Sequence, residues 1–317
     1  MDSPAAGRQG SVPVSDTPAV KFSTMFSMVD PSFYVPLARA AEEAGFSSIG
    51  LADSICYPKE SDSTYPYNPD GTREFLENKP FVEPLVCAAA MGAATATIRF
   101  HTAVLKLPIR NPVIFAKEVT SVAAITGGRF DLGVGISPWP DDYEVCQVPW
   151  EGRGRRFEEC IEIVAKLSTG DYVEHHGELY RFRAVKMNPP ARIPILIGGH
   201  NNKSLDRAAR LGDGWLPAGM SFEQMESALG TIRELRRRYG RDHLPFAVHA
   251  ICMESFNPDG VKRLAELGVT HAVGGFSGFN PYGRDPDTET LQMKVDALNR
   301  YAEQVISRTE DVEPAPI

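Results

Sequence analysis

The sequence predicts a single (β/α)8 TIM barrel with insertions after its second and fourth strands. Three observations lead to this fold class. Four junctions share one pattern, in which a glycine ends a helical stretch and an apolar strand begins within a few residues, at 41–53, 124–135, 208–217 and 265–275. Eight such strands alternate with eight helical segments along the chain. The length of 317 residues, with 43% hydrophobic and 23% charged residues, suits one large folded domain.

The elements follow from periodicity. We expect strands near 21–27, 48–53, 98–104, 130–135, 194–198, 214–217, 246–252 and 271–275. We expect helices near 32–44, 81–95, 112–126, 153–168, 202–211, 221–239, 258–267 and 287–307, several with an apolar stripe at helical spacing. A doubly wound open sheet is the alternative, but such a sheet usually carries a GxGxxG motif after its first strand, and residues 22–33 contain no glycine.

Two segments interrupt the alternation. Residues 55–80 are rich in proline and tyrosine, and their aromatic side chains favour an ordered lid after the second strand. Within 136–193, the stretch around His176-Gly177 is typical of a β-hairpin. Both insertions are expected to crowd the catalytic face. Residues 1–19 have the composition of a disordered tail, which leaves 20–317 as the barrel domain.

The charge balance limits the classes of partner. The net charge of −8 and the pI of about 5.5 disfavour nucleic acids and anionic membranes as partners, so we expect a small-molecule substrate. No apolar stretch approaches the ~20 residues of a spanning helix, and a cytoplasmic protein is expected. The five cysteines include no CxxC pair, and the histidines have no metal-ligand spacing, so no metal is expected.

The ligand-binding face of a barrel lies at the C-terminal ends of its strands. Here those ends are rich in glycine and poor in acids and bases, as in 133–137 and 198–201. A sugar-phosphate isomerase or aldolase, with its phosphate at the glycine-rich stretch 272–280, is a rival interpretation. It lacks an acid/base or lysine constellation, because Lys106 is the nearest lysine and is expected to be solvated at the rim.

Five motifs in order resemble a known family. They are TAVLKLPIRNPVIFAKEVTSVAAITGGRF, TGGRFDLGVG, VPWEGRGRRFEE, HHGELYRFRAVKMNPP and IPILIGGHNNKSLDRAARLGDGW, which together cover most of the chain after the tail. The sequence is similar to the bacterial luciferase-like monooxygenase family and, within it, to the oxidoreductases that use coenzyme F420, a deazaflavin.

The resemblance implies a cofactor site on the catalytic face. The flavin-type ring would lie against a non-prolyl cis peptide at the end of the third strand, around Thr102, Ala103 and Val104. The fourth strand would contribute Gly133, Val134, Gly135 and Ser137. The cofactor phosphate would meet the backbone of Gly198, Gly199, His200, Asn201, Ala218 and Gly219, where glycine permits close approach and a helix N-terminus favours an anion.

Two positions depart from the family pattern. F420-dependent relatives often place histidine after the second-strand aspartate and glutamate after the fourth-strand GxG, whereas this chain has Ser54 and Ile136. Asp53 and Ser54 remain the catalytic candidates, although Asp53 is equally suited to capping the loop that follows it.

Four aromatic residues are candidates for the substrate pocket, although packing is the alternative role for each of them: Tyr57, Tyr65, Tyr67 and Trp139. The expected function is hydride transfer between F420 and a small organic substrate. An FMN-dependent monooxygenase with a separate reductase and a non-catalytic flavin-binding barrel are the alternatives. The expected assembly is a homodimer.

Overall fold

The computed structural model describes residues 19–65, 71–275 and 287–317, and in these ranges the strands form a closed parallel barrel. The sheet order is β3-β2-β1-β11-β10-β9-β8-β5-β4, and an additional pairing of β3 with β5 closes it. Because β3 (Arg99–Thr102) and β4 (Leu105–Lys106) both pair with β5, they are two halves of one barrel strand. The barrel therefore has eight strand positions in the described ranges, which confirms the predicted fold class.

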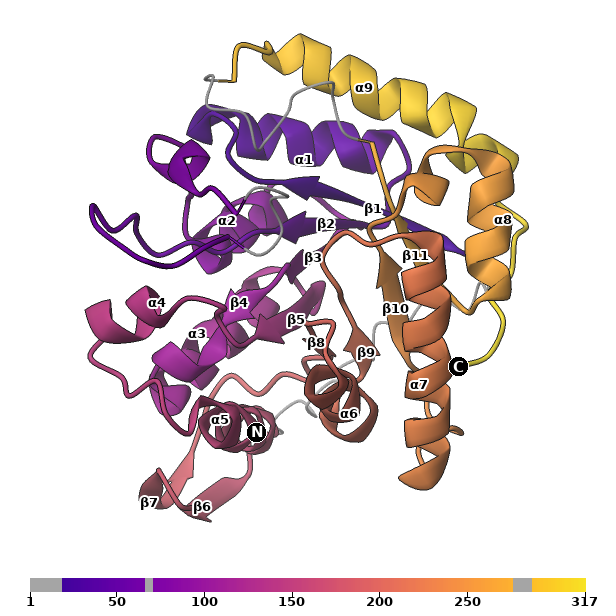
Figure 1. The fold of residues 1–317 in the computed structure, drawn as a ribbon. Helices are drawn as coiled ribbons and strands as arrows, with labels where there is room; N and C mark the ends of the chain where they lie inside the picture. Colours follow the sequence, from indigo (N-terminus) through magenta and orange to yellow (C-terminus); the bar gives the residue numbers. More distant parts are fainter. Residues whose placement is uncertain (1–18, 66–70, 276–286) are drawn as a thin grey trace, which may run out of the picture.

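The helices surround the barrel on its outside (Figure 1). The other strands of the barrel are β1 (Lys21–Phe26), β2 (Ser48–Leu51), β5 (Phe130–Gly135), β8 (Ile195–Ile197), β9 (Gly214–Trp215), β10 (Ala247–Ala250) and β11 (His271–Val273). The helices are α1 (Tyr34–Glu43), α2 (Pro84–Ala93), α3 (Pro112–Ile125), α4 (Pro140–Val145), α5 (Arg153–Leu167), α6 (Asn202–Leu211), α7 (Phe222–Arg238), α8 (Pro258–Glu266) and α9 (Leu291–Gln304). No helix in the described ranges is long and apolar enough to cross a membrane.

Local sequence explains where the helices begin. Asn111 and Asn201 accept hydrogen bonds from the first-turn amides of α3 and α6, and proline stands at the first position of α3. Ser221 and Gln224 form a reciprocal capping box at the start of α7. The short helix α4 is absent from the predicted elements, because six residues are too few for a helical period to show.

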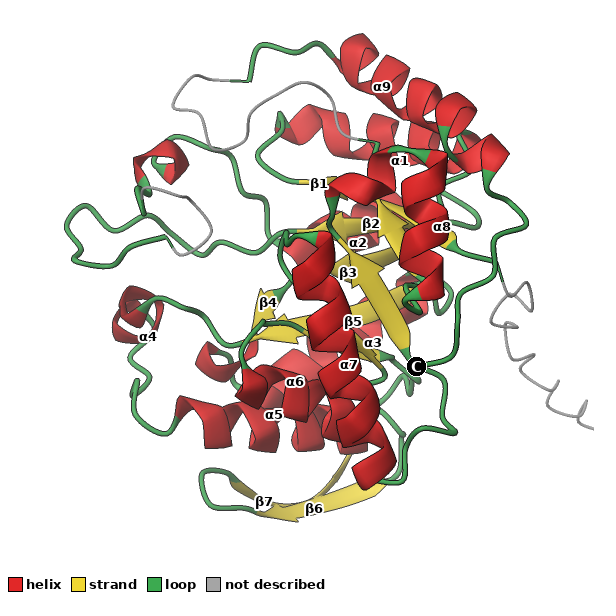
Figure 2. Cartoon of the chain, turned by 45° about the vertical axis from the view of Figure 1, so that its right-hand side comes forward, coloured by secondary structure: helices red, strands yellow, loops and turns green. Residues whose placement is uncertain are grey.

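The predicted hairpin is present, but its place differs from the expectation. Strands β6 (Tyr172–His176) and β7 (Arg181–Lys186) form a separate antiparallel pair beneath α5, away from α4 and the strand ends (Figure 2). Glu159 of α5 holds the hairpin, because its carboxylate accepts hydrogen bonds from the backbone amides of Leu179 and Tyr180 and contacts His175 Nε2 at 3.1 Å. The hairpin therefore covers the side of the barrel and not the catalytic face.

The inside of the barrel is unusually polar. His101 of β3 lies 4.7 Å from His249 of β10, measured between ring centroids, although these strands are not neighbours in the sheet. The His249 ring in turn stacks on that of His271 at 4.2 Å. Arg99 and Asp131 form an ion pair of 2.6 Å toward the N-terminal end of the same interior. Barrel interiors are usually filled by branched apolar side chains, so three adjacent imidazoles, two of them stacked and the third tilted, are a distinctive feature of this chain.

A second apolar cluster forms a roof over the strand ends. Its buried members come from three places in the sequence and are Met28, Phe75, Leu76 and Trp139, with Tyr57, Tyr65 and Phe81 packed against them. Met28 follows β1, Trp139 follows β5, and the others belong to the long loop after β2. The described parts of this loop thus form a packed cover, as expected from its aromatic content.

Candidate functional site

A bulge divides the third barrel strand at the catalytic face. The peptide bond between Ala103 and Val104 is cis, where the family resemblance placed it. The Ala103 amide donates to the carbonyl of Leu51 at 2.7 Å, and the Thr102 hydroxyl donates to the carbonyl of Gly133 at 2.6 Å. Both neighbouring strands therefore hold the bulge, while Ala103 and Val104 stay partly exposed.

Three of the predicted cofactor-binding glycines make room for this bulge. A Cβ at Gly133 would lie 1.8 Å from the carbonyl oxygen of Thr102, which no side-chain rotation could relieve. A Cβ at Gly135 would lie 2.7 Å from Val104, and one at Gly198 would lie 3.0 Å from the same side chain. Packing against the bulge therefore requires glycine at the ends of β5 and β8, whether or not a cofactor binds there. Val134, between the β5 glycines, is buried in the core.

The turn after β8 leads into the N-terminus of α6. Gly199 has a φ of 106°, which favours glycine, and its carbonyl accepts a hydrogen bond from the Trp215 indole at 2.9 Å. Asn201 caps α6 through the Ser204 amide. In the described part of the chain, the amides of the first-turn residues Asn202 and Lys203 donate to no protein acceptor. Such free amides at a helix N-terminus favour an anion.

The segment after β9 lies beside this turn. Burial lowers the pKa of His200, although its hydrogen bond with the backbone of Ala218 opposes that shift. His200 is therefore a residue that joins two turns, and Ala218 and Gly219 are brought next to the predicted phosphate site. Gly219 is exposed, and a Cβ added to it would make only ordinary contacts with Ile251.

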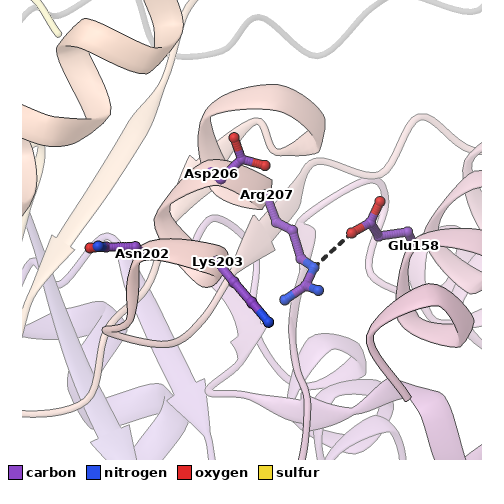
Figure 3. Close-up of a pocket in the computed structure, with 5 residues that line it drawn as sticks. All are labelled: Glu158, Asn202, Lys203, Asp206 and Arg207. Atoms are coloured by element: carbon purple, nitrogen blue, oxygen red, sulfur yellow. Dashed lines mark hydrogen bonds and ion pairs between the residues drawn. The ribbon is translucent and has the colours of Figure 1, made fainter. Parts of the chain in front are cut away.

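A groove opens beside the start of α6 (Figure 3). Lys203 and Arg207 extend from α6 on the side that faces Glu158 of α5. Arg207 is paired with Glu158 at 2.9 Å, whereas the exposed Lys203 forms no ion pair within residues 19–65, 71–275 and 287–317. The groove is thus lined by two cations and by the carboxylates of Glu158 and Asp206, and among the described residues Lys203 is the lining cation without an ion pair.

Asp53 is engaged by the protein itself. Its side chain is 2% exposed, its Oδ2 accepts a hydrogen bond from the Lys106 amide at 2.9 Å, and its Oδ1 lies 3.1 Å from the Arg110 guanidinium. Ser54, by contrast, is partly exposed, and Ile136 packs partly against the core. Neither of these two positions, which depart from the family pattern, carries a carboxylate or an imidazole.

The prediction for Lys106 was wrong. Its ammonium group forms an ion pair of 2.8 Å with Asp142, and the side chain is only 11% exposed, so Lys106 is mostly covered and engaged and not solvated at the rim. The Ser137 hydroxyl also donates to Asp142, and both partners are buried. The Ser137 hydroxyl, which was predicted to contact the cofactor, is thus already engaged in a hydrogen bond that holds α4.

The predicted pocket aromatics gather in the roof. The Trp139 indole donates to the carbonyl of Thr64 at 3.2 Å, and its ring lies 5.8 Å from that of Tyr65. The Tyr57 ring is 4.9 Å from the Arg73 guanidinium. Tyr67 lies outside the described residues. Trp139 is 4% exposed, so its packing role is evident, whereas Tyr57 and Tyr65 are partly exposed.

Packing explains part of the glycine-rich stretch after β11, which was the alternative phosphate site. A Cβ at Gly274 would meet the Tyr301 ring at 2.4 Å, and one at Gly275 would meet the Phe46 ring at 2.5 Å. These glycines therefore allow helix-to-barrel packing, and residues 276–280 of the motif lie outside the described residues. Within the described ranges, no group of three His, Cys, Asp or Glu side chains is arranged to hold a metal ion.

Arg110 and Asp142 are site residues that the sequence did not indicate. Each neutralises a residue at the strand ends, and each comes from a segment that is distant along the chain. Arg110 is the last polar residue before the Asn111-Pro112 helix start, which is the one local signal that could have drawn attention to it.

Comparison with known proteins supplies the family. The sequence model of luciferase-like monooxygenases matches residues 15–300 of this chain. The chain belongs to the luciferase-like monooxygenase family. It is thus an oxidoreductase of that family.

Individual relatives of this luciferase-like oxidoreductase differ in what is known of them. The uncharacterized protein Rv0940c of Mycobacterium tuberculosis is 50% identical over 291 residues, which cover 91% of this chain and 100% of the relative. The F420-dependent glucose-6-phosphate dehydrogenase of Gordonia bronchialis is 29% identical over 202 residues, covering 62% of this chain and 55% of the relative. The structure of the coenzyme F420-dependent tetrahydromethanopterin reductase of Methanopyrus kandleri superposes with a TM-score of 0.68 at 16% identity, covering 92% of this chain and 99% of that one.

Proposed function

We propose that this luciferase-like oxidoreductase binds coenzyme F420 and transfers hydride between it and a small organic substrate. The observation that carries the proposal is the pairing of two features on one face. The partly exposed bulge at Ala103 and Val104 offers a flat support for a ring, and the free amides of Asn202 and Lys203 offer a phosphate site. The relatives that use F420 support the choice of cofactor.

The groove beside α6 supports F420 over FMN. Beyond its phosphate, F420 continues into an anionic tail, which FMN lacks. Lys203 belongs to the first turn of α6, and its ammonium, which has no ion pair among the described residues, lies in the groove of Figure 3. A cation in this place favours a ligand that carries negative charge past the phosphate.

Each part of the site has a separate task in this proposal. Ala103 and Val104 would support the ring, the turn at Gly199 would let the phosphate approach the backbone, and the roof around Trp139 would exclude water. When bound, F420 supplies the hydride-carrying carbon of its ring. Since Ser54 and Ile136 replace the acid/base pair of some relatives, the protein is expected to act on substrates that need no strong acid from these positions.

Two other functions remain as alternatives. An FMN-dependent monooxygenase is favoured by the family as a whole. A non-catalytic flavin-binding barrel is favoured by the departures at Ser54 and Ile136. Binding of FMN but not of F420 would favour the FMN-dependent monooxygenase over the proposed function. Cofactor binding without turnover of any substrate in a panel would favour the non-catalytic barrel.

The phosphate and tail site is tested with Lys203→Ala. The variant is expected to weaken F420 binding by about 1 kcal/mol, as for one partly screened charge, and to weaken FMN binding less. Lys262→Ala is the matched control, because Lys262 is an exposed lysine on α8 that pairs with Asp259 in its own helix. Equal losses for F420 in both variants would argue against a tail site beside α6.

We also propose that the protein is a homodimer, with α2 and α3 at the interface. Helix α2 contains no charged residue, and Val86 on it is 62% exposed. On the neighbouring α3, Ile114 and Ile125 are 61% and 56% exposed. Between its two isoleucines α3 also exposes Lys117 and Glu118, so the apolar part of this surface is formed by Val86, Ile114 and Ile125. Exposed apolar side chains on two neighbouring helices favour a protein contact, and a second copy presents the same surface.

A further inference from the structure

The polar contacts of the bulge single out one residue. On its N-terminal side, the bulge is held by main-chain pairing of Ala103 with Leu51. On its C-terminal side, the Lys106 amide donates to the Asp53 carboxylate at 2.9 Å. Asp53 thus reaches from the end of β2 to the point where the third strand resumes. Both ends of the bulge are attached to β2 or to the two residues that follow it.

Arg110 fixes the Asp53 carboxylate in this position. One guanidinium nitrogen lies 3.1 Å from Oδ1 and 3.2 Å from Oδ2, so both oxygens face donors. The Asp53 side chain is 2% exposed and that of Arg110 is 21% exposed. Each carboxylate oxygen thus already accepts from a donor of the protein, and the buried side chain leaves little of the carboxylate open to a bound ligand.

We propose that Asp53, held by Arg110, is a positioning residue that fixes the bulge under the cofactor ring, and that it neither donates nor accepts the reaction's proton. This inference rests on the proposed function, because it assumes that a ring lies on the bulge. In this proposal Asp53 determines where the ring lies, and other groups transfer the proton. A misplacement of about 1 Å in such a support is enough to cost on the order of 100-fold in activity.

The chain offers a matched control for this ion pair. Arg99 and Asp131 are also an Arg–Asp pair on the third and fourth strand positions, at 2.6 Å, but they lie toward the opposite end of the barrel. Asp131→Asn removes a charge from an ion pair as Asp53→Asn does, without touching the bulge. The two variants therefore separate loss of stability from loss of cofactor positioning.

The experiment titrates wild type, Asp53→Asn, Asp131→Asn and Arg110→Lys with F420, following cofactor fluorescence and the absorption spectrum of the bound ring. Asp53→Asn is expected to weaken binding about 10-fold or more and to shift the bound spectrum toward that of free F420. Arg110→Lys keeps the charge but loses the guanidinium geometry, so an intermediate effect is expected. Asp131→Asn is expected to lower the melting temperature while its affinity and spectrum stay those of wild type.

Three results would overturn the inference. If Asp53→Asn bound F420 with wild-type affinity and spectrum, Asp53 would not position the ring. If Asp131→Asn weakened binding as much, the effect would be one of general stability. If wild type bound neither F420 nor FMN, the proposed function would fail and the inference with it, which distinguishes that failure from the first two. Should Asp53→Asn not fold, Arg110→Lys carries the same comparison.

Discussion

The three adjacent imidazoles inside the barrel predict a loss of stability in acid. Burial lowers the pKa of His101 to about 4, and it lowers the pKa values of His249 and His271 well below 6.5. The cationic neighbours Lys21 and Arg99 add to these shifts. Asp131, the acidic neighbour of His101, is already paired with Arg99. The folded protein therefore keeps these histidines neutral at pH values where the unfolded chain protonates them.

The sign and size of the effect follow from proton linkage. Above a pH of about 6.5, neither state binds protons at these sites, so they impose no penalty. Below it, the unfolded state takes up protons that the folded state refuses, and the free energy of unfolding falls by about 1.4 kcal/mol per pH unit for each histidine. For His101 the window runs down to a pH of about 4, which amounts to roughly 3.4 kcal/mol. Three such sites together give a limiting slope of about 4 kcal/mol per pH unit.

The assay is urea unfolding followed by circular dichroism between pH 7.5 and 4.5. His249→Leu is expected to reduce the slope by about one proton, because it removes the middle ring of the stack. His243→Gln is the control, since His243 is exposed and lies outside the barrel interior, so this variant removes a histidine without disturbing the three rings. The prediction would be contradicted if unfolding of the wild type took up less than one proton, or if wild type and His249→Leu showed equal pH dependence of the unfolding free energy.

Three further predictions concern packing and assembly. Gly133→Ala is expected to prevent folding or to cost about 3 kcal/mol or more in urea unfolding, because its Cβ would meet the Thr102 carbonyl, whereas Gly230→Ala, with open space around it, is expected to stabilise by up to about 1 kcal/mol; equal effects would contradict the packing argument. Lys106→Met leaves a buried carboxylate unpaired, so it is expected to cost about 3 kcal/mol and to speed proteolysis within 137–145, and an unchanged digestion pattern would show that the ion pair does not anchor this segment. Val86→Glu is expected to convert a dimer into a monomer in light scattering with little change in melting temperature, and a wild-type monomer would end the dimer proposal.

The sequence was informative where a feature is local. Helix ends at glycine, strand starts and asparagine caps depend on a few neighbouring residues, so the eight-fold alternation was readable. The position of the cis peptide followed from the family resemblance. The glycines of the strand ends were predicted to bind the cofactor, but their packing role was not predicted, because it depends on the bulge that Gly133 and Gly135 face.

The sequence was uninformative where partners meet only after the barrel closes. Lys106 was misjudged because its partner Asp142 belongs to a short helix that has no periodic signal. The contact of His101 with His249 joins strands that lie on different sides of the barrel. The hairpin was recognised, but its packing on α5 depends on contacts of Glu159 that no local pattern encodes.

The central claim is that this face of the barrel holds F420, and a direct titration of the purified protein with F420 and with FMN tests it. We expect saturable F420 binding at micromolar concentration, tighter than that of FMN and weakened by salt because of the anionic phosphate and tail. Binding of FMN alone would favour the FMN-dependent monooxygenase instead. Binding of neither cofactor would contradict the claim.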